Sequence, residues 1–98
     1  MDLKQLEYFT AVVEEGNISA AAKKLHISQP PLSNQIHLLE DEFNCTLFER
    51  GARKIQLTEP GRILYDRAVT LLEMAELLKR EINDYSNGSR GVLRFGII

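Results

Sequence analysis

A long apolar repeat in the C-terminal part of the chain constrains its fold more than any other feature. Between residues 59 and 87, apolar side chains recur at alternating intervals of four and three residues, which is the spacing of a coiled-coil seam. The seam consists of Leu64, Ala68, Leu71, Ala75, Leu78, Ile82 and Tyr85. A helix of this extent is about 40 Å long, more than a domain of this size can cover. The repeat therefore predicts pairing with a second copy, with packing back onto the same domain as the alternative.

The start of the chain predicts two shorter helices. Asp2 followed by Gln5 resembles a capping box, and apolar residues then recur at helical spacing until Gly16, so we expect a helix over residues 3–15. Ser19 is positioned to cap a short second helix. Three successive alanines in that helix suit a place where another helix comes close.

A third helix is predicted from Gln29 or Pro30 to about Glu42, and it begins with two prolines. The first N–H groups of a helix have no intrahelical partner, so Pro30 and Pro31 fit there without breaking a hydrogen bond. Ser28 is the natural N-cap, but its hydroxyl is less committed to the backbone because proline has no N–H. The helix start thus suits an anionic partner with apolar spots, and a rigid turn between helices is the alternative reading.

The exposed face of the third helix is polar. Projected at 100° per residue, this face holds Pro30, Asn34, His37 and Asp41, with Ser33 at its edge. It carries no lysine or arginine. Two helices joined by a short turn, the second with a polar face near its N-terminus, describe a helix-turn-helix.

The segments that follow predict a wing and then a change of domain. Residues 46–50 and 55–58 have the composition of short strands, and "GARK" between them has turn character, so we expect a hairpin with a basic tip. We expect a winged helix-turn-helix over residues 1–58 and a linker helix over 59–87. We expect residues 88–98 to form a flexible hinge and the first strand of a further domain.

Composition excludes several classes of site. One cysteine cannot form an internal disulfide, and two histidines offer no zinc spacing. Neither a nucleophile with its base nor paired carboxylates can be picked out, so we expect no enzyme and no cofactor in this part of the protein. No apolar run is long enough to span a membrane and no secretory signal is present, which predicts a cytoplasmic protein. The net charge of −2 argues mildly against nucleic acid, but acidic and basic residues form separate clusters.

Taken in order, the motifs resemble the LysR-type transcriptional regulators of bacteria. The resemblance covers "LKQLEYFTAVVEEGNISAAAKKLHISQPPLSNQIHLLEDEFNCTLFER" and "LTEPGRILYDRA", and so almost the whole chain. It implies a mainly α fold, a winged helix-turn-helix of three helices and a two-stranded wing followed by a long dimerisation helix. The implied partners are double-stranded DNA, a second subunit through the linker helix, a tetramer in the full-length protein and, potentially, RNA polymerase. A small-molecule effector is expected to bind a further C-terminal domain.

The resemblance also implies roles for individual residues. The family's recognition positions correspond here to Gln29, Pro30, Pro31, Ser33 and Asn34. Many family members carry arginine where this chain has Asn34; asparagine favours adenine where arginine favours guanine. The remaining candidates for DNA contact are Ser28, His37, Arg50, Arg53 and Lys54. His37 can reach a base or only solvent. The alternative to DNA binding is a protein–protein interaction module, in which the long helix forms the binding surface.

Overall fold

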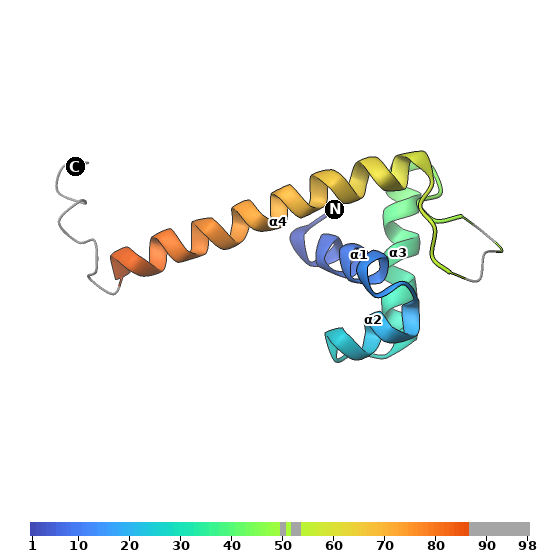
Figure 1. Ribbon diagram of the computed structural model, residues 1–98, viewed down its shortest axis with the longest axis horizontal. Coiled ribbons are helices and arrows are strands. Elements are labelled where there is room, and N and C mark those ends of the chain that lie inside the picture. Colours follow the sequence, from blue (N-terminus) through green and yellow to red (C-terminus); the bar gives the residue numbers. More distant parts are fainter. Residues whose placement is uncertain (50, 52–53, 87–98) are drawn as a thin grey trace.

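The computed structural model describes residues 1–49, 51 and 54–86. It contains four helices, α1 (Leu3–Glu15), α2 (Ile18–Leu25), α3 (Gln29–Phe43) and α4 (Glu59–Ser86). Figure 1 shows α1, α2 and α3 packed together on one side of the first part of α4, whose remaining length projects away from them. The mainly α fold predicted from the sequence is confirmed, and the predicted helix over residues 3–15 has the predicted bounds.

Helix ends follow the side chains that satisfy their free backbone groups. Asp2 caps α1 by accepting a hydrogen bond from the Gln5 backbone N–H at 2.8 Å, and Gly16 ends the helix in the left-handed conformation, at φ 86°. The predicted cap of α2 was wrong. Asn17, not Ser19, accepts the hydrogen bond from the Ala20 N–H, because the chain resumes a helical path directly after Gly16.

The hydrophobic core lies where α1 meets the other helices. α1 packs against α2, α3 and α4, while α2 also packs against α3. The largest fully buried side chains include Phe9 and Val12 of α1, Leu32 and Leu39 of α3, and Leu47. Two of the alanines of α2, Ala21 and Ala22, are buried as well, which agrees with the close approach predicted for them.

The wing is less regular than the sequence predicts. In its described part, the two predicted strands are reduced to one antiparallel bridge, between Phe48 and Leu57. Around this bridge, Glu49 N–H donates to Gln56 O at 2.8 Å and Thr58 N–H donates to Leu47 O at 3.1 Å. The ring of Phe48 lies 5.4 Å from that of Phe9, measured between centroids, so the base of the wing is anchored on the core.

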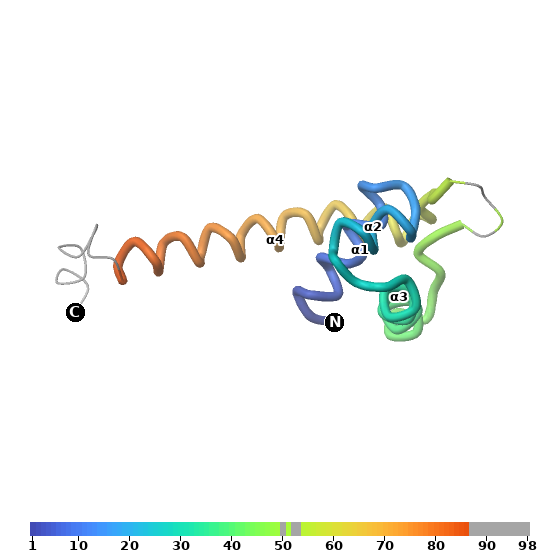
Figure 2. Tube along the Cα trace, turned by 90° about the horizontal axis from the view of Figure 1, so that it is seen from below, coloured from blue at the N-terminus to red at the C-terminus, as the bar shows by residue number. Residues whose placement is uncertain are grey.

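α4 has a packed part and a projecting part. Ala68 is fully buried and Leu64 packs against the core, whereas Leu71, Leu78 and Ile82 are exposed. Figures 1 and 2, which are turned by 90° relative to each other, both show the later part of α4 extending beyond the other helices. Among the helices described, none is long and apolar enough to cross a membrane.

Candidate nucleic-acid interface

A tight turn sets α3 against α2. His26 ends α2 in the left-handed conformation, at φ 60°, and its backbone N–H bonds back to the last turn of that helix. The Ile27 N–H also donates to Ala22 O, at 3.0 Å. This pattern satisfies the free carbonyl groups of α2 and turns the chain within three residues. The predicted helix-turn-helix is therefore present, with α3 as its second helix.

The first turn of α3 is open to solvent. Ser28, Gln29, Pro30 and Pro31 are all exposed, and the Ser28 side chain makes no capping hydrogen bond. This agrees with the prediction that the Ser28 hydroxyl is less committed to the backbone than that of an ordinary N-cap. Asn34, one turn further, is exposed too. This end of α3 therefore offers a hydroxyl, two amide side chains and two proline rings beside the positive end of the helix dipole.

A groove of about 370 Å³ separates α3 from the wing. Ser33, His37 and Glu40 line it from α3, and Glu49 lines it from the wing. Ile18 and Ile36 form part of its apolar floor. Two of the predicted DNA-contacting residues, Ser33 and His37, thus share a concave surface with the wing.

Glu40 connects α3 to the wing, a role that sequence analysis missed. Its Oε2 accepts a hydrogen bond from the Leu47 N–H at 2.7 Å, and its Oε1 lies 3.6 Å from Nδ1 of His37. The Glu40 side chain is only 12% exposed, whereas that of His37 is 61% exposed. The spacing of three residues between His37 and Glu40 is visible in the sequence, but the bond to Leu47 depends on how the wing folds back.

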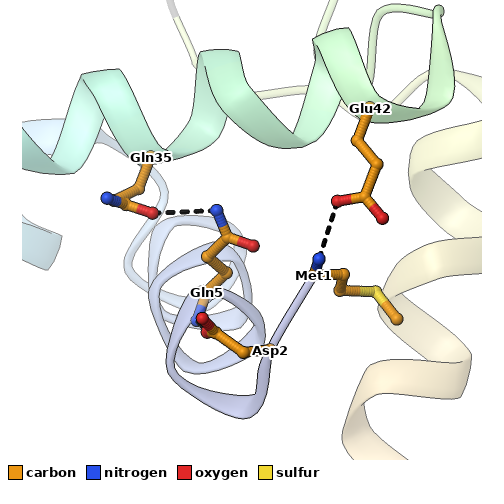
Figure 3. A network of polar contacts seen from close by, with 5 residues as sticks. All are labelled: Met1, Asp2, Gln5, Gln35 and Glu42. Atoms are coloured by element: carbon orange, nitrogen blue, oxygen red, sulfur yellow. Dashed lines mark hydrogen bonds and ion pairs between the residues drawn. The ribbon is translucent and has the colours of Figure 1, made fainter.

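Two contacts from the start of the chain hold α3 from its other side (Figure 3). Gln5 Nε2 of α1 donates to Gln35 Oε1 of α3 at 2.9 Å. The Met1 amino group forms an ion pair with Glu42 at 2.8 Å. With the core beneath them, these contacts fix the position of α3 relative to α1.

The basic candidates are only partly placed by the structure. Arg50 and Arg53 lie outside the described residues, and so does the hinge predicted within residues 88–98. Lys54 is exposed beside the wing. On α2, Lys24 pairs with Glu15 at 3.3 Å and Lys23 is exposed. In the described part of the interface, positive charge therefore lies at the edges, on α2 and the wing, and not on α3.

A second surface lies along α4. Its exposed apolar side chains are Ile63, Leu71, Met74, Leu77, Leu78 and Ile82. Leu71, Met74 and Leu78 line a groove of about 460 Å³ together with Leu3 of α1. Of the predicted seam, Leu71, Leu78 and Ile82 are exposed, Leu64 and Ala75 are half-buried, and Ala68 is buried inside its own chain. Part of the apolar repeat thus packs against its own domain, which was the alternative to pairing with a second copy.

Over the part of the chain that the structure describes, no three His, Cys, Asp or Glu side chains gather in a way that could hold a metal ion. Cys45 is a free thiol.

Comparison with known proteins assigns this architecture to one group. The sequence model described as "Bacterial regulatory helix-turn-helix protein, lysR family" matches residues 3–62. The chain is 44% identical over 98 residues to the HTH-type transcriptional regulator TfdS of Cupriavidus pinatubonensis, covering all of this chain and 33% of that protein. The chain thus spans about a third of the length of the curated relatives it matches.

Solved structures give the same picture. The structure titled "BenM_DBD/benA site 1 DNA Complex" matches with a TM-score of 0.86 and 42% identity, over 90% of this chain and 99% of that one. CbnR, titled a LysR family transcriptional regulator, matches with a TM-score of 0.80 and 42% identity, over 86% of this chain and 29% of that one.

Proposed function

Because the chain belongs to the lysR family of bacterial regulatory helix-turn-helix proteins, we propose that it reads the sequence of double-stranded DNA to regulate transcription. In this proposal α3 enters the major groove and the wing lies at the backbone or minor groove. The observation that carries it is the open first turn of α3, where Gln29, Pro30, Pro31 and Asn34 are exposed while the opposite side of the helix is buried. The similarity to a BenM domain solved with DNA supports it.

Each exposed group at this end has a matching partner on a duplex. Gln29 and Asn34 can form paired hydrogen bonds with adenine, and the rings of Pro30 and Pro31 can touch thymine methyl groups. The Ser28 and Ser33 hydroxyls can donate to phosphate oxygens, as Lys54, Arg50 and Arg53 can from the wing. His37 lies further along the same side. Affinity from the wing should depend on salt, and base preference should come from the start of α3.

We further propose that the chain acts as a homodimer through α4. Leu71, Leu78 and Ile82 form an exposed stripe that one chain leaves in water. Pairing of two stripes would remove this apolar surface from solvent, with Ala75 at its edge. Leu64 and Ala68, already packed within the chain, would support the stripe from beneath rather than contact the partner directly. A two-fold dimer presents two α3 helices, which suits an inverted-repeat site.

These two proposals assign a different role to each segment of the chain. Residues 1–58 would read DNA, residues 59–87 would join two subunits, and residues 88–98 would lead into an effector-binding domain of the cytoplasmic full-length protein. Binding of a small effector there, assembly to a tetramer and contact with RNA polymerase belong to the whole regulator and are proposed on family grounds.

Selection from random duplexes tests the proposal. The 98-residue chain is incubated with the pool at two salt concentrations, and retained DNA is sequenced. We expect an enriched, roughly palindromic motif that is retained less at the higher salt concentration. Asn34→Arg should shift the preferred base at one position of each half-site from adenine toward guanine. Asn83→Arg adds the same charge to α4, away from α3, and should leave the motif unchanged.

The opposite result has an equally definite meaning. Absence of any enriched motif together with salt-insensitive, weak retention would reject DNA reading. The interaction-module alternative would then stand, with the apolar stripe of α4 as the working surface.

A further inference from the structure

α3 is unusually acidic for a helix that contacts DNA. Its sequence from Gln29 to Phe43 contains no lysine or arginine, but it contains three carboxylates, Glu40, Asp41 and Glu42. DNA-contacting surfaces are normally positive because the phosphates they meet are negative. His37 is the one side chain of α3 that can carry a positive charge, since histidine is the only basic residue type in this helix.

The structure places His37 where such a charge would act. Its side chain is 61% exposed and lines the groove between α3 and the wing, together with Ser33 one turn earlier. On the helix surface it follows Asn34, which is also exposed. A duplex docked on the start of α3 would therefore pass close to the imidazole ring.

Glu40 orients that ring. The carboxylate is nearly buried, and the hydrogen bond from the Leu47 N–H to its Oε2 fixes it against the base of the wing. Its other oxygen lies 3.6 Å from Nδ1 of His37, within ion-pair reach. This contact turns the Nδ1 side of the ring toward the protein and leaves Nε2 on the side away from Glu40.

Among the described residues, the charged side chains that line the grooves beside His37 are carboxylates. Asp41 of α3 lines a second groove beside the ring, and Glu49 faces it from the wing. α2 contributes only Ile18 to these two surfaces, and among the described residues that line them none is lysine or arginine. With His37 neutral, a phosphate approaching this surface meets three carboxylates. With His37 charged, the nearest of them, Glu40, is paired.

We propose that His37 is a proton-dependent phosphate contact, in which the imidazolium held by Glu40 donates from Nε2 to a phosphate oxygen of the bound duplex. The inference rests on the proposed DNA-reading function. It makes DNA binding proton-coupled: the complex takes up a proton from solvent at each α3. Affinity is then highest at mildly acidic pH, and it declines as the pH rises and the imidazole loses its charge.

The test is a pH series of equilibrium binding with the 98-residue chain. Dissociation constants for the selected duplex are measured by fluorescence anisotropy between about pH 5.5 and pH 8, a range in which histidine changes charge. We expect affinity to fall about fivefold per protomer across the series, the usual gain of a charge-assisted over a neutral hydrogen bond. The slope of log Kd against log salt should also be steeper at the acidic end, by about 0.9 per protomer for one more neutralised phosphate.

The chain has only two histidines, which provides a matched control. His37→Asn should abolish both the pH dependence and the difference in salt slope. His26→Asn should retain both effects, since asparagine tolerates the left-handed conformation of residue 26. His37→Gln serves as a second variant at the test position, with far-ultraviolet circular dichroism to verify folding of each protein.

The outcomes separate this inference from the proposed function. Sequence-specific binding with equal affinity at both ends of the series, or a pH dependence that survives in His37→Asn, would overturn the inference and leave DNA reading intact. A pH dependence without a change in salt slope would overturn the phosphate assignment. Failure to bind any duplex at any pH would overturn both proposals together.

Discussion

The backbone of Gly61 in α4 lies directly against the carbonyl oxygen of Leu47. A Cβ atom added at Gly61 would collide with that oxygen and would press on the Leu57 side chain. The first turn of α4 is therefore seated on the base of the wing, and the Thr58 hydroxyl reinforces the junction by accepting a hydrogen bond from the Gly61 N–H at 3.1 Å. Close contact here requires glycine for its small size rather than for its backbone freedom.

We expect Gly61→Ala to lower the free energy of unfolding by about 1–3 kcal/mol, the usual cost of overpacking, although alanine is the better helix former. Urea denaturation measures the change. Arg62→Ala is the control, because Arg62 lies at the surface in a pair with Glu59, and it should cost little. Equal stability of Gly61→Ala and the parent chain would show that α4 can move away from the wing without loss.

Removal of the Glu40 carboxylate should weaken the base of the wing. Glu40→Ala leaves the Leu47 N–H without its acceptor next to a buried side chain, which costs about 1–3 kcal/mol. Glu40→Gln keeps an acceptor oxygen and should lose less. Thermal and urea unfolding of the two variants measure the loss of stability. A larger loss of stability in Glu40→Gln than in Glu40→Ala would contradict the role given to the Leu47–Glu40 hydrogen bond.

The bond from Tyr65 to Glu14 predicts a stability difference at alkaline pH. The Tyr65 hydroxyl donates to Glu14 at 3.0 Å, and this hydrogen bond, with a smaller effect of burial, raises the pKa of Tyr65 above its ordinary value of 10.0. Because the pKa of Tyr65 is raised in the folded state, the contribution of this hydrogen bond to the free energy of unfolding is complete below the unfolded-state pKa. It is lost as the pH rises through the folded-state pKa.

Tyr65→Phe should therefore be less stable than the parent chain near neutral pH, by about 0.5 kcal/mol given the exposure of the pair. The difference should begin to shrink once the pH exceeds about 10, the ordinary pKa of tyrosine, and should disappear as the pH rises through the raised folded-state pKa of Tyr65. Urea denaturation across this range measures it, and Tyr8→Phe removes a hydroxyl from α1 as a control. A difference that does not change with pH would assign the loss to packing instead.

The α4 stripe predicts how the proposed dimer can be broken. Leu71→Asp places a charge within the exposed apolar stripe and should weaken association by at least about 30-fold, as the loss of one buried leucine implies. Analytical ultracentrifugation gives the mass. Asn83→Asp makes the same change in charge on another side of α4 and should leave the mass unchanged. A dimeric Leu71→Asp protein would place the contact elsewhere.

Local sequence signals predicted the helices well because each depends on residues close together in the chain. The capping pair Asp2 and Gln5, the stop at Gly16 and the proline pair before Leu32 all act within one or two turns. The cap of α2 was misplaced because Asn17 and Ser19 are both good caps, and the choice between them depends on the backbone path after Gly16.

Contacts between distant residues could not be predicted in the same way. Periodicity marked Ala68 and Leu78 as equivalent, yet one is buried against its own chain and the other is exposed, because α1 covers only part of α4. The link from His37 through Glu40 to Leu47 likewise arises only once the wing folds back on α3. The open first turn of α3, in contrast, was predictable, since prolines and an uncommitted serine are local features.

The projection of α4 past the other helices makes it a lever. Its only helical neighbour in the described structure is α1, and the Tyr65–Glu14 bond lies near the pivot. From Tyr65 to Ser86 the helix rises about 32 Å, so a tilt of about 10° against α1 displaces its far end by about 5 Å. A small tilt at the contact between α1 and α4 thus becomes a larger translation at the tip of α4, and a displacement of the tip returns to α1 as a small change in angle.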